Sequence, residues 1–182
     1  MAFVAEDGTG LSNANSYASV AFADDYFTDR GNTVWSAATT GQKQAALVRA
    51  TDWVEKRFGR RFRGYKRSKT QSLEWPRLDA FDNDDFLLAG AEDNVPRQLL
   101  KAVCEYAVRA LSATLGPDNA NVGIDSIKEK VGPIETSSTR SSFQTAAGSS
   151  LISAASIPDY PEADLWVEEL LKPAGSRRLV RG

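Results

Sequence analysis

The chain has 182 residues, of which 42% are hydrophobic and 25% charged, and its formal net charge at pH 7 is −2. With no histidine and a single cysteine, it has neither an internal disulfide nor a Cys/His zinc cage. The usual general base near pH 7 is also missing. We therefore expect a non-enzymatic globular domain, with no catalytic residue, cofactor or metal site.

Nothing in the sequence indicates export or membrane insertion. No run approaches the ~20 apolar residues of a membrane span, and the first residues lack the basic and apolar segments of a signal peptide. We expect no membrane association and a protein kept in a cytosol or in a particle assembled there. Its slightly acidic balance argues against a bulk nucleic-acid binder.

Hydrophobic periodicity predicts three core helices, over residues 16–30, 40–58 and 94–116. Asn15 or Ser16 is expected to cap the first helix and Asn94 the third, because short polar side chains accept from free first-turn amides. Cys104 falls on the apolar face of the third helix and is expected to be buried. With a short C-terminal helix, the pattern predicts a mainly α fold: a small helical bundle with a long interrupted loop and a minor extended β segment.

The remaining segments complete the predicted domain organisation. Residues 60–94 lose the helical period, and long excursions of this kind are usually functional or interface-forming. Residues 124–136 alternate as an extended segment does. The chain is therefore divided into a helical body over 1–135, a Ser/Thr/Ala-rich tether or arm over 136–157, and a docking helix with a basic tail over 158–182.

The charges in the long excursion are strongly segregated. Residues 56–77 hold nine basic side chains against one acid, and residues 78–94 hold six acids and no base. Such runs are often only solvated faces, but two functions compete with that interpretation. In the first, subunits associate, with Arg60, Arg61, Arg63, Lys66 and Arg67 of one copy facing Asp82, Asp84 and Asp85 of the next.

The second function is a single-stranded DNA groove. There the same cations would neutralise phosphates while Phe62 and Tyr65 stack on bases. We favour self-association, because a phosphate groove gains nothing from an adjacent acidic stretch.

The C-terminal helix also allows two interpretations. It either folds back onto its own bundle or lies in the groove of a partner. The tether that precedes it favours the partner, and deletion of residues 158–182 is then expected to leave the body folded. The predicted docking residues are Leu165, Trp166, Leu170, Leu171, Arg177, Arg178 and Leu179.

Several motifs carry a resemblance to a known family, over residues 4–135. They are EDGTG at 6–10, NANSY at 13–17, AALVRATD at 45–52, GRRFRG at 59–64, QSLEWPR at 71–77, VP at 95–96 and KVGPI at 130–134. In these motifs the chain resembles tailed-bacteriophage proteins often labelled DnaT-like single-stranded DNA binding proteins. In organisation it is similar to head–tail connector adaptors.

The resemblance implies a structural protein of the virion neck, assembled in the host cytoplasm. Twelve copies would form a ring beneath the portal and extend the DNA channel toward the tail. The C-terminal docking residues would engage the portal protein, and a stopper or tail-completion protein would bind the other side. Genomic double-stranded DNA would pass through the lumen without specific binding. The alternative that the family label implies is single-stranded DNA binding.

Overall fold

The computed structural model describes residues 2–88, 95–116, 126–131, 134–139 and 159–172. Contacts divide the chain into two units, Met1–Leu115 with Asp159–Gly182, and Gly116–Pro158. Among the described residues, the first unit holds every α-helix and the second holds one β-hairpin. The predicted mainly α class is confirmed.

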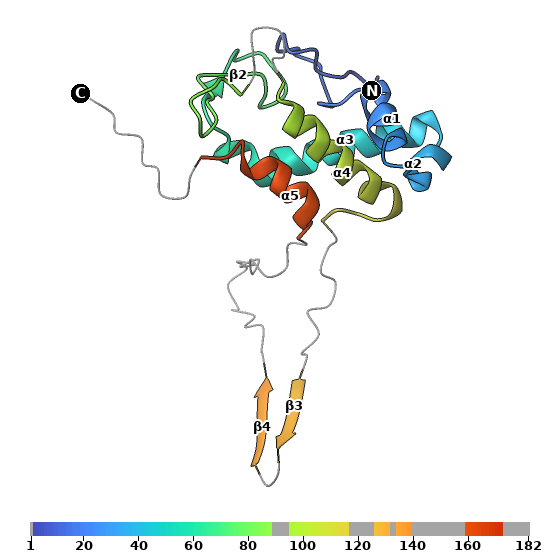
Figure 1. Ribbon diagram of the computed structural model, residues 1–182, viewed down its shortest axis with the longest axis vertical. Helices are drawn as coiled ribbons and strands as arrows, with labels where there is room; N and C mark the ends of the chain where they lie inside the picture. The colour runs from blue at the N-terminus through green and yellow to red at the C-terminus, as the bar shows by residue number, and fades with distance from the viewer. Residues whose placement is uncertain (1, 89–94, 117–125, 132–133, 140–158, 173–182) are drawn as a thin grey trace, which may run out of the picture. The chain divides into compact units, whose positions relative to one another are not determined.

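Two long helices, α3 (Thr40–Phe58) and α4 (Arg97–Ser112), pack against each other at the centre of the first unit (Figure 1). Their facing side chains make the core, which includes Leu47, Val54, Leu99, Val103 and Cys104, all fully buried. The predicted second helix and the buried thiol are thus confirmed. Helix α4 begins at Arg97, with Pro96 at its N-cap rather than the expected cap Asn94, which lies outside the described residues.

Helix α1 (Val20–Thr28) starts four residues later than predicted. Ser19 caps it, since its hydroxyl accepts from the Phe22 amide at 3.1 Å. Ser16, an expected cap, instead pairs with the N-terminal arm: its amide donates to the Val4 carbonyl at 3.2 Å. Pairing with the arm holds this residue outside the helix.

A short helix, α2 (Thr33–Ala37), was not predicted. The Asn32 side chain caps it by accepting from the Trp35 amide at 3.0 Å. Trp35 is buried, with its ring centroid 4.9 Å from that of Phe27 on α1. A five-residue helix shows too little periodicity to be recognised in a sequence, and this tertiary contact stabilises it.

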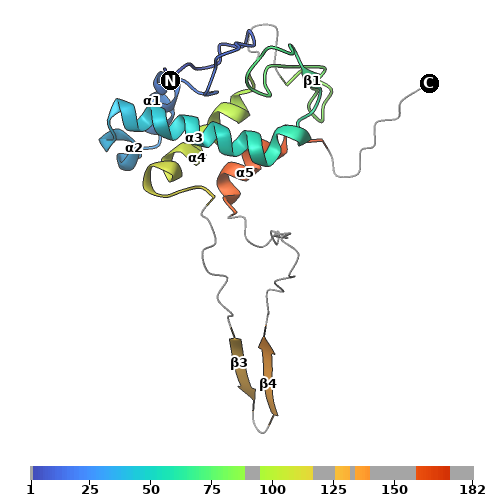
Figure 2. The ribbon, with the colours of Figure 1, turned by 180° about the vertical axis from the view of Figure 1, so that it is seen from behind.

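Helix α5 (Pro161–Glu168) packs against α4 in the same unit as the rest of the bundle (Figures 1 and 2). Leu170 and Leu171, which follow its C-cap Glu169, are buried, and the Arg63 amide donates to the Leu170 carbonyl at 3.0 Å. The segment therefore folds back onto its own bundle, the interpretation that we did not favour. An apolar helix this short is stable only when its apolar side is covered.

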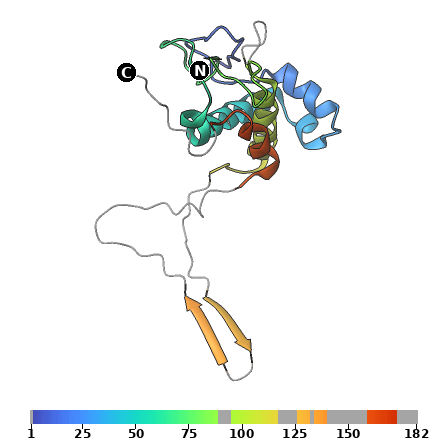
Figure 3. The same ribbon diagram turned by 60° about the vertical axis from the view of Figure 1, so that its left-hand side comes forward.

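Two antiparallel strand pairs complete the described structure. Strands β1 (Tyr65–Lys66) and β2 (Arg77–Leu78) pair within the long excursion. In the second unit, β3 (Ser126–Val131) pairs with β4 (Ile134–Thr139), which confirms the extended segment (Figure 3). Strand β4 includes the first four residues of the predicted tether, and residues 140–158 lie outside the described structure.

Candidate interaction surface

The excursion between α3 and α4 is held together by one buried guanidinium group. Arg77 donates through Nε to the Arg63 carbonyl at 2.7 Å and through Nη2 to the Gly64 carbonyl at 2.9 Å, and its Nη1 pairs with Glu74 at 2.8 Å. Gly64 has a φ of +67°, and a Cβ there would lie 2.1 Å from the Leu78 carbonyl oxygen. Only glycine fits this close approach.

A second cluster ties the excursion to α3. The Tyr17 hydroxyl donates to the Glu55 carboxylate and accepts from the Trp75 amide at 3.2 Å. The Glu74 amide also donates to Glu55, at 3.1 Å. Burial raises the pKa of both Tyr17 and Glu55 above their ordinary values. These residues are therefore fixed structural partners of the segment at 71–77.

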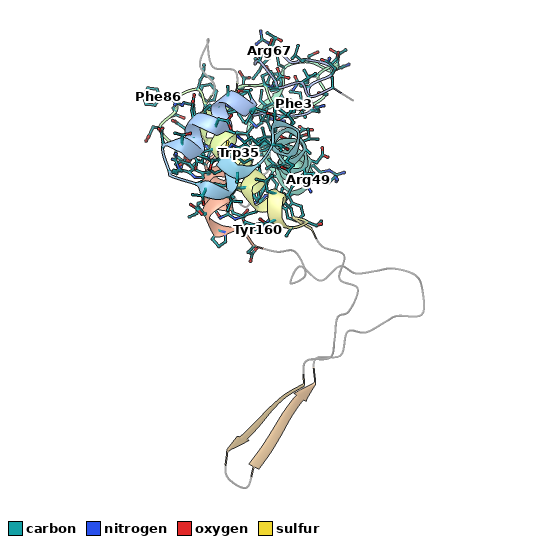
Figure 4. All side chains as sticks on the ribbon, turned by 90° about the vertical axis from the view of Figure 1, so that its right-hand side faces the viewer. Phe3, Trp35, Arg49, Arg67, Phe86 and Tyr160 are labelled. Carbon is teal, nitrogen blue, oxygen red and sulfur yellow. The ribbon has the colours of Figure 1, made fainter. Side chains whose placement is uncertain are left out.

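The N-terminal arm closes over the same region. The Glu6 carboxylate accepts from the amides of Gly8, Gly10 and Leu11 at 2.8–3.0 Å. Arg67 donates to the Gly8 carbonyl at 3.4 Å, and Figure 4 shows Arg67 at the same end of the body as the arm. The Ser72 amide also donates to the Leu11 carbonyl at 3.0 Å. The arm is thus tied to residues 67–72 of the excursion.

The structure corrects part of the predicted DNA groove. Phe62 is fully buried, so its ring is not available to a base. Arg63 donates to the carbonyls of Leu171 and Phe81 at 2.9 and 2.7 Å, and Lys66 pairs with Glu74 at 3.2 Å. Three of the predicted contact residues are thus engaged inside the chain.

The other predicted residues of the basic stretch face solvent. Arg60, Arg61 and Arg67 are exposed, and the ring of Tyr65 is 51% exposed. The Arg60 side chain has no hydrogen bond or ion pair within the described residues, while the Arg61 guanidinium lies 5.9 Å from the centroid of the Phe58 ring. Four solvent-facing side chains of the predicted groove therefore remain.

The acidic stretch forms a compact loop closed by its own hydrogen bonds. The Asp82 carboxylate accepts from the amides of Asp84 and Phe86, both at 2.9 Å, and the Asp82 amide donates to the Phe86 carbonyl at 2.8 Å. Arg63 reaches this loop through Asn83, at 2.6 Å. The basic and acidic stretches thus contact each other within one chain, which the prediction of purely intersubunit pairing did not include.

Large apolar side chains project from this acidic loop. Phe86, labelled in Figure 4, is 71% exposed. Leu87 is 55% exposed, and Phe81 is also exposed. We call Phe81, Asp82, Asp84, Asp85, Phe86 and Leu87 the loop patch. Sequence reasoning missed its apolar members, although apolar side chains inside an otherwise acidic segment were a visible signal.

A family model described as "Putative DnaT-like ssDNA binding protein" matches residues 1–182. The chain belongs to this family. No curated protein and no solved structure matches the chain. The DnaT-like part of the expected resemblance is confirmed, and nothing in the comparisons shows a head–tail connector family.

In this member of the DnaT-like family, the predicted C-terminal docking residues fall into three groups. Leu170 and Leu171 are in the core and are corrected from partner anchors to bundle residues. Leu165 is 64% exposed, and Trp166 is half-buried beneath Lys101, whose Nζ lies 4.3 Å from the ring centroid. Arg177, Arg178 and Leu179 lie outside the described residues.

Across the described residues, no cluster of three or more cysteine and carboxylate side chains could hold a metal ion. Within the same residues, no helix has the length and apolar character needed to cross a bilayer. Burial raises the pKa of the Cys104 thiol, which keeps it protonated and unreactive. Within the described part of the excursion, the loop patch and the basic side chains beside Tyr65 are exposed.

Proposed function

We propose that the chain is a structural subunit of a phage neck, forming a ring-shaped head-to-tail adaptor that docks on the portal and extends the DNA channel toward the tail. The loop patch carries this proposal, because large apolar side chains exposed together mark a protein interaction surface. The number of copies, the portal, the stopper and the position in the neck rest on the resemblance.

The chemistry of the loop patch favours a protein partner over a nucleic acid. Asp84 and Asp85 are exposed, and neither forms an ion pair among the described residues. Carboxylates within about 8 Å of a phosphate repel it at physiological salt. Apolar side chains flanked by carboxylates therefore suit a protein surface that offers an apolar recess and a cation.

The test is to locate the chain in mature particles and to disrupt the loop patch. We expect immunogold labelling or particle imaging to place it between the portal and the tail. Phage carrying Phe86→Ser should accumulate unjoined heads and tails, whereas the matched Tyr65→Ser should assemble normally. Mature particles that lack the chain altogether would refute the proposal.

A second candidate is single-stranded DNA binding, which the family description favours directly. Among the described residues, its support is the exposed ring of Tyr65 together with the cations of Arg60, Arg61 and Arg67. An aromatic ring that stacks on bases, flanked by cations that neutralise phosphates, is the usual arrangement of sequence-tolerant binders.

This candidate makes a separate prediction in solution. Fluorescence anisotropy with a labelled oligothymidine should show affinity that falls steeply as salt rises. Tyr65→Ala should weaken that affinity about fivefold or more, the loss expected for one stacked base. Phe86→Ala, at an aromatic in the acidic loop that is also exposed, is the matched control and should change little. Absence of binding at low salt eliminates the candidate.

A further inference from the structure

A groove lies between the α1–α2 corner and the C-terminal part of α4. It is open to solvent and encloses about 840 Å³. Its apolar lining includes Phe27, Val34 and Val108, and Val34 is exposed although it is a large aliphatic side chain. Arg30, Glu105, Arg109 and Glu162 also line it, so the groove is a recess of mixed apolar and charged character that no described segment of the chain fills.

The groove also offers a cation. The Arg30 guanidinium lies 3.6 Å from the centroid of the Tyr26 ring and donates to the Tyr26 carbonyl at 2.9 Å. It has no carboxylate partner in the part of the chain that the structure describes. Arg109, which also lines the groove, is by contrast paired with Glu105 and Glu162, both at 2.9 Å. Arg30 is therefore the groove cation available to an incoming carboxylate.

The loop patch has the complementary properties. Several of its backbone groups are bonded within the loop: the Asp82 amide donates to the Phe86 carbonyl, the Phe86 amide to the Asp82 carboxylate, and the Leu88 amide to the Ala80 carbonyl at 2.8 Å. A loop already held in one conformation loses little entropy when it binds. It presents Phe86 and Leu87 beside the unpaired carboxylates of Asp84 and Asp85.

The two surfaces are associated with opposite ends of α3. The groove includes residues of α1 and α2, which precede the start of α3, and the loop patch is anchored through Arg63, which follows its end. Figure 2 shows α1 and α2 at one end of α3 and β1 at the other. A helix of 19 residues is about 28 Å long. Because the two complementary surfaces lie at opposite ends of α3, they suit a head-to-tail contact between copies.

We propose that the loop patch of one copy inserts into this groove of a second copy. Phe86 and Leu87 pack on Val34 and Val108, and the carboxylates of Asp84 and Asp85 pair with Arg30. The contact is heterologous, so repetition closes into a ring if the rotation between copies permits. This inference deepens the proposed function and rests on it.

Cross-linking between introduced cysteines tests the contact even if it is weak. Leu87→Cys puts a thiol on the loop patch and Ser112→Cys puts one on the exposed lining of the groove, and the native Cys104 is buried and does not compete. With a short bis-maleimide, a chain carrying both changes should give a ladder of multimers. A mixture of the two single variants should stop at a two-chain product.

Matched variants show whether the contact is specific. Arg49 is exposed and does not line the groove, so Leu87→Cys mixed with Arg49→Cys should give no product above background. Adding Phe86→Ser to the double-cysteine chain should abolish the ladder. Arg30→Glu should weaken it at least fivefold, and a further Asp84→Arg should restore it.

Two results overturn the inference: no ladder from the double-cysteine chain, or an equal yield from the Arg49→Cys control. Either could occur in a protein that imaging still places in the neck, in which case only this contact is wrong. A specific ladder from a protein absent from mature particles would instead retain the contact and remove the proposed function.

Discussion

Phe62 packs edge to face on Trp75, with ring centroids 5.9 Å apart and an angle of 73° between the ring planes. Both side chains are fully buried. Of the aromatic rings in residues 56–77, those of Phe58, Phe62 and Trp75 are therefore in the core, and only that of Tyr65 is at the surface. In the sequence, Phe62 and Tyr65 both look available to stack on bases. In the structure Phe62 belongs to the core, and only Tyr65 is available for binding.

This difference predicts opposite outcomes for two aromatic truncations. Phe62→Ala should lower the free energy of unfolding by about 3–5 kcal/mol, the usual cost of removing a buried phenyl ring. Tyr65→Ala should change it by only about 0.5 kcal/mol, since exposed positions away from special contacts are tolerant. Urea denaturation of both variants measures the effect. Equal stabilities would mean that Phe62 is not a core residue.

Gly64 provides a second prediction, with Gly31 as its control. Both residues have positive φ, +67° and +61°, so alanine costs about 1–2 kcal/mol at either position. At Gly31 an added Cβ meets nothing within 4 Å, whereas at Gly64 it would lie 2.1 Å from the Leu78 carbonyl oxygen. Gly64→Ala should therefore lower the unfolding midpoint clearly more than Gly31→Ala in the same urea titration. Equal losses would show that no close approach exists at Gly64.

The sequence predicted those elements whose evidence is local. Nineteen residues of α3 carry a continuous apolar period and a capping box between Thr39 and Gln42, so its bounds were recognisable. Helix α2 is held by the contact of Trp35 with Phe27, a tertiary contact that no window of sequence contains. The last three residues of strand β4 lie beyond the predicted extended segment, because this Ser/Thr-rich sequence has no apolar alternation, and the pairing with β3 defines the strand.

The candidate surface was less predictable, because it too depends on tertiary contacts. Charge counts identified the segregated stretches, but not which cations are used internally. The side chains of Arg63 and Arg77 donate hydrogen bonds to backbone carbonyl groups of the same chain. Which carbonyl groups they reach depends on the folded path of the backbone. Exposure of Phe86 likewise depends on how the loop closes, which composition alone does not determine.

Asp24 gives a prediction for pH dependence. Burial alone would raise the pKa of its carboxyl group, but hydrogen bonds from Lys43 at 2.8 Å and Trp35 at 2.7 Å outweigh burial and lower the pKa below its ordinary value of 3.8. A carboxyl whose pKa is lower in the folded state stabilises that state above the unfolded pKa, and the contribution disappears as pH falls through the folded pKa.

Asp24→Asn should therefore be less stable than the parent protein at pH 7, by about 0.5–1 kcal/mol for a partly exposed pair. The difference should narrow as the pH falls below 3.8. Urea midpoints measured across this range test it, with Asp25→Asn, an exposed neighbour on the same helix, as the control. A difference that is the same at every pH would show that the lost stability is not electrostatic.

Helix α5 gives the last prediction, which reverses the expectation from sequence. Because Ala163, Val167, Leu170 and Leu171 complete the core around α4, removing residues 158–182 should expose that core and unfold or aggregate the body.

Two point variants separate packing from partner binding. Leu170→Ala should cost about 2–5 kcal/mol of unfolding free energy, whereas Leu165→Ala, at a 64% exposed site, should leave stability unchanged and lower only the affinity for a portal partner. Thermal unfolding and a portal pull-down measure the two effects independently. If the truncated body has the same melting temperature as the full chain, α5 is not needed for the stability of the bundle. The interpretation of the C-terminal helix as a segment that docks on a partner would then hold.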